Sequence, residues 1–474
     1  MQPKTHTFKA NVREALTNEP LKAGLARLSS GFVEKRRLAA ERLPEFETLR
    51  DEGRDIKDHV LDNLDHYLVR FEERVTALGG HVHWCRDADE ACKTVLGICK
   101  DAGARTVTKG KSMIGEEIGI NAYLEAGGVT PVETDLGEYI IQLRNEPPAH
   151  IVVPAFHLSK EQIAENFREA HTQRPADRDL QEPRVILEEA REELRGKFLA
   201  ADVGLSGANM LIAETGTVAL VTNEGNADLT VSLPKTHVVM ASIEKIVPTL
   251  DDAATLLRLL ARSATGQDLS VYTSFLTGPK RDADLDGPEN FHVVLIDNGR
   301  TELMRTGFRD MLRCIRCGAC LNHCPVFQTI GGHAYGWVYP GPMGSVLSPG
   351  ILGPESTYDL PNASTLCGRC EDVCPVRIPL PSLLRLWREK QFAAKITPKT
   401  TRFGLKAWAW FASKPALYRL GTSLDVRFLA FLAGKKGRLS KLLGMGGWTD
   451  VRDFPASQGK TFMDQWRGRK GKDL

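Results

Sequence analysis

The sequence lacks any apolar run long enough to cross a membrane. No stretch approaches the roughly 18 uninterrupted apolar residues that a spanning helix needs, and the opening MQPKTHTFKANVREALTNEP has no apolar core of the signal-peptide type. Glycine-rich nucleotide signatures are also missing, because neither GxGxxG nor a P-loop occurs. We therefore expect a cytoplasmic globular chain, and nothing in the sequence supports nucleotide binding.

The net charge is only +2, but the charge is unevenly distributed. From residue 381 to the end there are 20 Lys and Arg against 6 Asp and Glu, so the tail is basic and the remainder is acidic. A basic tail suits an acidic partner, an anionic membrane surface or the chain's own acidic body. No nucleic-acid-binding module is visible, so we expect no nucleic acid among the partners.

The length and composition are typical of a globular protein with several domains. The 474 residues are 42% hydrophobic and 26% charged. We predict an N-terminal helical region (1–75) that packs on an α/β domain (76–303), then a cysteine-rich domain (304–395) and a basic helical region (396–474). The last region mixes aromatic and basic residues, as in FGLKAWAWFASKPALYRL. We expect it to pack on the cysteine-rich domain or a partner, or to lie on a membrane surface.

Short apolar runs alternate with longer amphipathic stretches between residues 80 and 300, which predicts a layered α/β domain. Strands are expected at 105–109, 150–155, 236–243 and 291–297. A hairpin at 210–223, turning at Glu214-Thr215-Gly216, is expected to join the same sheet.

Polar side chains gather near several of these strand ends, where open α/β sheets bind their ligands. A pocket for a small organic acid is one interpretation, and a set of helix caps and turns is the other. The residues are Lys109, Lys111, Glu133, Asp135, Glu138, Asn223, Glu224 and Asn226.

Four cysteines follow the spacing C-x2-C-x2-C-x3-C in CIRCGACLNHCP, from Cys314 to Pro325. Bacterial ferredoxins use this spacing, in which three thiolates bind one cubane and the fourth binds the other cluster. Zinc is the alternative, but zinc gains nothing from a third evenly spaced cysteine or from the terminal Cys-Pro. A cytoplasmic chain does not use clustered cysteines for disulfides. We therefore predict iron–sulfur clusters.

The second motif, STLCGRCEDVCP, holds only three cysteines, and Ser364 takes the place of the first. Crossed ligation gives cluster 1 a complete set of thiolates and leaves cluster 2 one short. Cluster 2 is then a 4Fe–4S cube completed by Ser364, His333 or water, a 3Fe–4S cluster, or a cube with an open iron for chemistry. The predicted ligands are Cys314, Cys317, Cys320 and Cys374 for cluster 1, and Cys324, Cys367 and Cys370 for cluster 2.

Two other features bear on the cysteines. The segment 331–350, GGHAYGWVYPGPMGSVLSPG, joins the motifs, and we expect its glycines and aromatic rings to pack on a cluster, with a plain loop as the alternative. Cys85, Cys92 and Cys99 recur every seven residues. On one helix they would be about 10 Å apart, too far to share a cluster, so we expect them to be buried hydrophobic side chains.

These blocks together resemble the lactate utilization protein B family of iron–sulfur proteins, collinearly and over nearly the whole chain. The matching segments include KSMIGEEIGINAYLEAGGVTPVETDLGEYIIQL, AETGTVALVTNEGN, GPENFHVVLIDNGR, CIRCGACLNHCPV, GGHAYGWVYPGPMGSVL and LCGRCEDVCPVRIPL. The three-cysteine second motif also resembles the family. The resemblance implies a LUD domain related to the fold of sugar-phosphate isomerases and CoA transferases. An α-helical ferredoxin-type domain with two 4Fe–4S clusters follows it.

The resemblance also implies a part in oxidising L-lactate to pyruvate, with this chain relaying electrons beside two companion proteins. It carries over the seven cysteine ligands and gives the α/β domain no firm catalytic role. The alternative is an enzyme that acts on a small organic acid or CoA ester in the α/β domain, with the clusters as electron outlet. A scaffold with structural clusters is a third class. The location implied is cytoplasmic, or peripheral to the inner face of the membrane.

Overall fold

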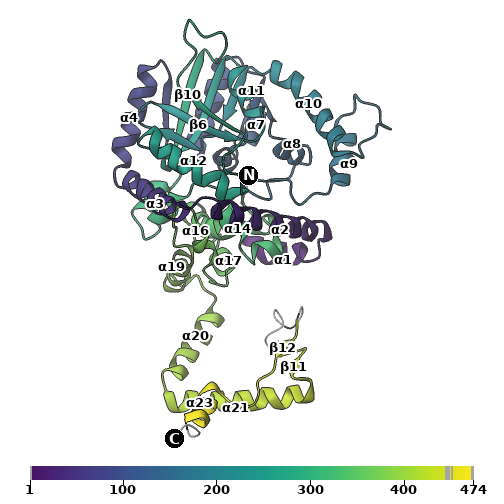
Figure 1. Ribbon diagram of the computed structural model, residues 1–474, viewed down its shortest axis with the longest axis vertical. Helices are drawn as coiled ribbons and strands as arrows, with labels where there is room; N and C mark the ends of the chain where they lie inside the picture. Colours follow the sequence, from purple (N-terminus) through teal and green to yellow (C-terminus); the bar gives the residue numbers. More distant parts are fainter. Residues whose placement is uncertain (1–2, 443–448, 450–451, 471–474) are drawn as a thin grey trace. The chain divides into compact units, whose positions relative to one another are not determined.

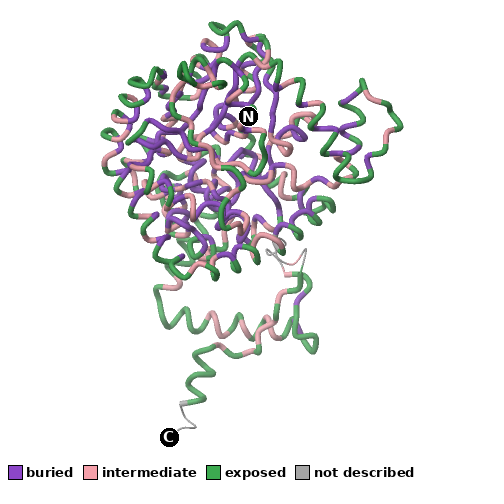
Figure 2. Tube along the Cα trace, turned by 45° about the horizontal axis from the view of Figure 1, so that its top comes forward, coloured by how far each residue is buried: buried purple, intermediate pink, exposed green. Residues whose placement is uncertain are grey.

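The computed structural model describes residues 3–442, 449 and 452–470, and it divides into two compact units, residues 1–393 and 394–474 (Figure 1). The first unit contains the α/β domain, the cysteine-rich domain and the N-terminal helices. Buried segments are concentrated in this unit, while the second is exposed along most of its length (Figure 2). Every described helix is too short or too polar to span a membrane.

A six-stranded sheet forms the centre of the α/β domain, with the strand order β1-β10-β7-β4-β2-β3 and parallel pairing throughout. Strands β4 and β7 are buried along their whole length. Continuous apolar runs are what a parallel sheet covered on both faces requires. The strands are β1 His81–Cys85, β2 Thr106–Lys109, β3 Thr130–Glu133, β4 Val203–Ser206, β7 Thr236–Ser242 and β10 Asn290–Ile296.

Helices cover both faces of this sheet. Val238 of β7 faces a core shared with α5 (Ala88–Asp101), and its neighbour Val239 faces a core shared with α4 (Leu64–Ala77). This alternation follows from the two-residue period of a strand. The predicted layered α/β fold is thereby confirmed. Its other helices are α6 Met113–Ile118, α7 Ile120–Ala126, α8 Leu136–Leu143, α9 Lys160–Ala170, α10 Pro183–Leu199, α11 Asn226–Ser232 and α12 Leu250–Ala264.

Two strand predictions in this domain are wrong. The hairpin forms from β5 (Met210–Ile212) and β6 (Thr217–Thr222), but it lies in a separate four-stranded sheet, because β5 pairs with β8 (Ile246–Val247) and β6 pairs with β9 (Tyr272–Leu276). The apolar segment 150–155 forms no strand. Its side chains instead contact the cysteine-rich domain.

Cys85, Cys92 and Cys99 are all buried, as expected, but they do not share one helix. Cys85 ends β1, whereas the other two lie on α5. Burial raises the pKa of the Cys92 thiol to about 11 and that of the Cys99 thiol to about 12, so these thiols stay neutral at physiological pH. They act as small hydrophobic side chains.

The N-terminal helices pack on the α/β domain as predicted, and they pack on the cysteine-rich domain as well. Helix α4 and Val60 of α3 (Phe46–Asp62) belong to the core of the central sheet, while α2 (Glu19–Glu41) and α3 contact α12. Helices α1 (Phe8–Ala15), α2 and α3 also share a core with the cysteine-rich domain. Several helices of that domain have only four residues, so the longer ones supply the apolar cover that it needs. Its elements are α13 Arg300–Met304, η3 Arg309–Arg313, α14 Ala319–Asn322, α15 Phe327–Ile330, η4 His333–Tyr335, α16 Gly341–Leu352, α17 Asp359–Asn362, α18 Arg369–Asp372 and α19 Leu380–Ala393.

The second unit consists of α20 (Lys399–Ala412), α21 (Pro415–Ala433), α23 (Phe462–Lys470) and a short pair of strands, β11 Arg438–Leu439 and β12 Phe454–Pro455. Aromatic side chains on its helices are exposed, with exposed fractions of 76% for Phe403, 62% for Trp408 and 82% for Phe431. Residues 443–448, 450–451 and 471–474 of the predicted basic helical region lie outside the described residues.

Candidate metal centre

The two cysteine motifs form the same local backbone twice. The residue before the second cysteine position has a positive φ in both motifs, 61° at Arg316 and 56° at Leu366. Gly318 (φ 76°) and Gly368 (φ 87°) then begin the short helices α14 and α18. Glycine adopts this conformation without the strain that a side chain brings. In both motifs the turn places the third cysteine position on the helix that follows.

Four cysteines enclose a small cavity. It is lined by Cys314, Cys317, Cys320 and Cys374, together with apolar side chains such as Met343. Three of these cysteines come from the first motif, and the fourth comes from the end of the second. The structure thus brings together the four thiols that we predicted for cluster 1. Met343 belongs to α16, so the segment 331–350 does approach this site, although it is helical from Gly341 onward.

The other three cysteines lie together beside this cavity. Burial and the neighbouring Cys324 raise the pKa of Cys370 to about 12, whereas Cys367 is exposed. The N–H of Arg369 and the side chain of Thr365 lower the pKa of the Cys367 thiol. One side of this group is therefore open to solvent, whereas three of the four cysteines around the cluster 1 cavity are buried and Cys314 is half-buried.

The two side chains proposed as a fourth ligand for cluster 2 differ in their surroundings. His333 Nε2 lies 2.8 Å from the carbonyl oxygen of Pro147, and its ring is 4.6 Å from the ring of His157. Ser364 occupies the position that matches Cys314, and its hydroxyl accepts a hydrogen bond from the N–H of Leu366 at 3.1 Å. His333 is thus engaged with the α/β domain, and Ser364 remains within the cysteine motif.

Burial makes these thiols weak acids in the absence of metal. It raises the pKa of Cys317 to about 12, with an added effect from Cys374, and it raises the pKa of Cys374 to about 11 against the N–H groups of Ile378 and Val376. A coordinated thiol is deprotonated outright, so cluster loading releases protons from this site. The same N–H groups then donate to a thiolate.

The arrangement of the cysteines fits a cluster. In the described part of the chain, no three His, Cys, Asp or Glu side chains converge closely enough to hold a single metal ion. A cube distributes its thiolates over separate iron atoms, so its ligands surround a volume and do not meet at one point as zinc ligands do. The enclosed cavity with four cysteines has this form, and its remaining lining is mostly apolar.

Cations from distant parts of the chain surround the cysteines, and the sequence reasoning missed them. Arg36 Nη2 donates to the carbonyl oxygen of Val373 at 2.9 Å, and Arg50 Nε donates to that of Cys374 at 3.1 Å. Both arginines are buried, with exposed fractions of 8% and 4%. The only signal in the sequence that could have identified these two arginines is a basic residue on the apolar face of an amphipathic helix.

The polar residues predicted at the strand ends form both buried pairs and caps. Lys109 Nζ is 2.5 Å from Glu133 Oε1, and Lys111 Nζ is 3.3 Å from Glu138 Oε1. Asp135 caps α8 by accepting hydrogen bonds from the N–H groups of Gly137 and Glu138. Burial raises the pKa of Glu138 well above its usual range, although Lys111 opposes the rise.

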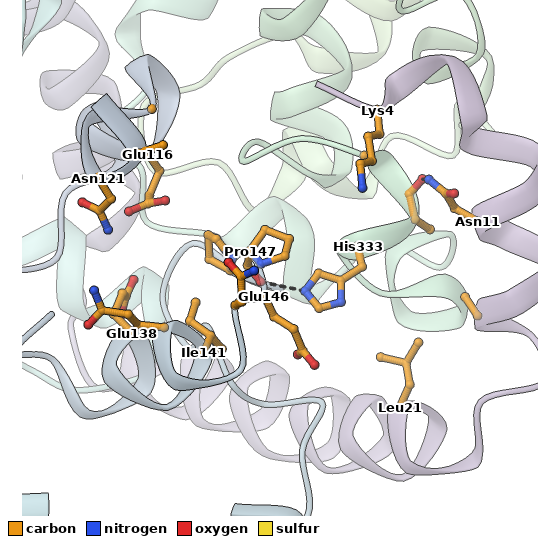
Figure 3. A pocket seen from close by; sticks show the side chains of 18 of the residues that line it. Lys4, Asn11, Leu21, Glu116, Asn121, Glu138, Ile141, Glu146, Pro147 and His333 are labelled. Atoms are coloured by element: carbon orange, nitrogen blue, oxygen red, sulfur yellow. Dashed lines mark hydrogen bonds between the residues drawn. The ribbon is translucent and has the colours of Figure 1, made fainter. Parts of the chain in front are cut away.

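Two cavities adjoin these charged groups. The first, of about 600 Å³, has Glu116, Asn121 and Glu138 on one side and Lys4 and His333 on the other (Figure 3). The second, of about 480 Å³, connects the strand ends to the cysteine-rich domain. Its lining includes Lys111, Asp135, Asn223, Glu224, Asn226, Arg316 and Cys317.

His150 joins the α/β domain to the cysteine-rich domain in its neutral form. Its Nδ1 accepts hydrogen bonds from the N–H groups of Val152 and Val153, and its Nε2 lies 3.0 Å from Asn322 Oδ1. This pattern places the ring proton on Nε2. Burial lowers the pKa of His150 from 6.5 to about 3, and burial also lowers the pKa of His237 to about 3.

We expect the free energy of unfolding to fall as the pH decreases from about 6.5 toward 3. The unfolded chain then binds protons that the buried rings of His150 and His237 cannot accept, at a cost of up to about 1.4 kcal/mol per pH unit for each histidine. Urea unfolding at a series of pH values tests this, with His150→Gln expected to reduce the slope. An equal slope in the variant would contradict the assignment.

Comparisons with known proteins agree with this architecture. Residues 68–296 match the LUD domain, residues 310–378 match the 4Fe-4S dicluster domain, and residues 388–471 match the family described as Lactate utilisation protein B, C-terminal. Lactate utilization protein B from Geobacillus sp. (strain WCH70) is 42% identical over 466 residues, which cover 97% of this chain and 96% of the relative. The chain belongs to the lactate utilization protein B family.

Other relatives extend this picture. The "uncharacterized electron transport protein YkgF" of Escherichia coli (strain K12) is 40% identical to this lactate utilization protein B family member over 467 residues, covering 98% of this chain and 97% of that one. A DUF162 family protein from Deinococcus radiodurans aligns with 49% of this chain and 98% of its own, at 15% identity and a TM-score of 0.27. The full-length relatives confirm the predicted family, and the dicluster match identifies residues 310–378 as an iron–sulfur domain.

Proposed function

We propose that this lactate utilization protein B family member relays electrons from the oxidation of L-lactate to pyruvate through two 4Fe–4S clusters, within a multi-protein system. The observation that carries the proposal is the enclosed cavity in which Cys374 of the second motif joins three cysteines of the first. Relatives named for lactate utilization and electron transport support it.

The chain's own residues would hold the two clusters at a fixed separation. Cys314, Cys317, Cys320 and Cys374 are the proposed ligands of cluster 1, and Cys324, Cys367 and Cys370 those of cluster 2, with Ser364 at the fourth position. Such clusters accept and release single electrons when bound. Cys320 lies on the short helix α14, and Cys324 follows two residues after the end of that helix. One short segment thus carries a ligand of each cluster. We assign the exposed side at Cys367 to electron exchange with a partner.

Stopped-flow absorption of the anaerobically reconstituted full chain tests the relay. We expect L-lactate to bleach the cluster absorption only after companion lactate-utilization proteins are added, because the proposed role of the clusters is to carry electrons that a companion releases from lactate. Bleaching by L-lactate alone would contradict the relay and favour an enzyme in the α/β domain. Clusters that stay oxidised in the complete mixture would instead indicate a structural role.

The second unit is proposed as a contact surface. Its helices expose large side chains such as Trp408 and Phe431, and the surrounding sequence is basic. We assign this surface to a companion protein first, and to an anionic membrane surface second. Flotation with anionic liposomes separates the two: recovery of the chain with the vesicles supports the membrane, and recovery in the protein fraction supports the companion.

A further inference from the structure

A small cavity lies between the α/β domain and the cysteine-rich domain. Its volume is about 130 Å³, and its lining includes Lys111, Asn209, Lys245, Arg316 and Tyr339. Lys111 follows β2, Lys245 follows β7, and Arg316 belongs to the first cysteine motif. The cavity adjoins the 480 Å³ cavity, because Lys111, Asn209 and Arg316 line both. The two cavities are therefore neighbours in the structure.

The positive charge around this inner cavity is only partly neutralised. The Arg316 side chain has an exposed fraction of 8%, and its Nη2 lies 3.0 Å from Glu244 Oε1, but its Nη1 has no hydrogen-bond partner. Lys245 makes no ion pair within 4 Å among the described residues, although the charge of the adjacent Glu244 acts on it. Burial and the charge of Arg316 lower the pKa of Lys245 to about 8, against the effect of Glu244, so the ammonium stays largely protonated at neutral pH.

The remaining polar groups leave donors for a ligand. Lys111 Nζ donates to the carbonyl oxygen of Val152 at 2.9 Å and pairs with Glu138, which fixes its position. Asn209 Oδ1 accepts a hydrogen bond from the N–H of Val221 at 2.9 Å, which leaves the amide nitrogen as a donor. Arg316 Nη1 is a buried donor without a partner, and with two cations in the lining the cavity is suited to an anion.

The volume indicates the size of that anion. Cavities of about 150 Å³ hold benzene, a molecule of about six non-hydrogen atoms, and lactate and pyruvate are of the same size. A carboxylate can accept from the arginine and the lysine together, and an oxygen on the next carbon can accept from the asparagine amide.

We infer that this cavity binds the carboxylate of a small 2-hydroxy or 2-oxo acid, held by Arg316 and Lys245, with Asn209 donating to the oxygen on the second carbon. The choice of acid rests on the proposed function, whereas the presence of an anion site rests on the cavity alone. The site lies beside cluster 1, because Arg316 directly precedes Cys317 and Cys314 acts electrostatically on both cations. The acid would therefore bind next to the first electron carrier.

Isothermal titration calorimetry of the reconstituted full chain with pyruvate, L-lactate and inorganic phosphate tests this inference. We expect pyruvate and L-lactate to bind. The Lys245→Met substitution should raise the dissociation constant for pyruvate on the order of tenfold to a hundredfold. Lys235→Met is the matched control, because Lys235 is an exposed lysine of the same domain, 3.9 Å from Glu289. We expect no change in that variant.

The thermal midpoint of each variant separates a loss of binding from a loss of folding. We expect Lys245→Met to leave the midpoint unchanged, because the substitution breaks no ion pair among the described residues. Three outcomes would overturn the inference: no carboxylate binding, binding unchanged in Lys245→Met, or binding of phosphate without binding of either acid. Absence of binding together with an intact relay would reject this site alone. Binding without cluster reduction in the complete mixture would reject the proposed function alone.

Discussion

Replacing Cys374 with Ser is expected to remove cluster 1 and to leave cluster 2 in place, although Cys374 follows two proposed ligands of cluster 2 in the sequence. The cavity that contains Cys374 is lined by Cys314, Cys317 and Cys320, so the loss of this thiolate opens the cluster 1 site. Iron per chain should fall by about half after anaerobic reconstitution. Because cluster binding contributes folding free energy, the thermal midpoint should fall as well.

Two other variants complete this experiment. Cys370→Ser should remove the electron paramagnetic resonance signals of cluster 2 and preserve those of cluster 1. This is the opposite of the result expected for Cys374→Ser. Ser364→Cys restores the missing cysteine of the second motif, and it should increase the fraction of cluster 2 that keeps four irons in air. Crossed ligation would be refuted if Cys374→Ser and Cys370→Ser removed the same signals.

Replacing Arg300 with Met is expected to destabilise the first unit by about 3–5 kcal/mol, because it leaves the buried carboxylate of Glu117 without its cation and removes one of the two arginines beside Glu244. Arg300 has an exposed fraction of 0%. Its Nη1 and Nη2 lie 2.8 and 2.7 Å from the two carboxylate oxygens of Glu117, and its Nε lies 2.8 Å from Glu244 Oε2. These contacts join α13 to both α6 and the end of β7.

Urea unfolding followed by tryptophan fluorescence measures this effect. The double variant Glu117→Gln with Arg300→Met removes one stranded charge and should recover part of the loss. Arg281→Met is the control, because Arg281 forms an exposed pair with Asp284, and its midpoint should not move. An Arg300→Met midpoint equal to that of Arg281→Met would show that the buried network does not contribute to stability.

Local sequence patterns correctly predicted the strands and helices whose burial follows from their own apolar periodicity. The runs at 105–109, 236–243 and 291–297 are strands, because β-branched side chains in the centre of a parallel sheet are buried on both faces. Two of the amphipathic stretches between residues 80 and 300, EQIAENFREAH and DDAATLLRLLARSA, correspond to helices α9 and α12. The apolar periodicity of each of these segments is sufficient to predict its secondary structure, with little contribution from distant residues.

The sequence patterns gave wrong predictions for segments of similar composition whose structure depends on contacts with distant residues. The segment 150–155 is as apolar as the segments that form strands. Its polar groups bond elsewhere, however: His150 Nε2 contacts Asn322, and the carbonyl oxygen of Val152 accepts from Lys111. The hairpin at 210–223 was correctly predicted as a hairpin and assigned to the wrong sheet, because its pairing with β8 and β9 depends on segments up to about 60 residues away.

The sequence by itself determined the chemistry of this protein: cysteine spacing is a local property, and it predicts which thiols can surround one cluster before any fold is known. Only the tertiary structure decided the electrostatic environment of those thiols. Arg36, Arg50 and Lys245 lie far from the cysteine motifs in the sequence, and packing alone brings them near the cysteines. Charges act through space and not along the chain, so their arrangement follows from the fold.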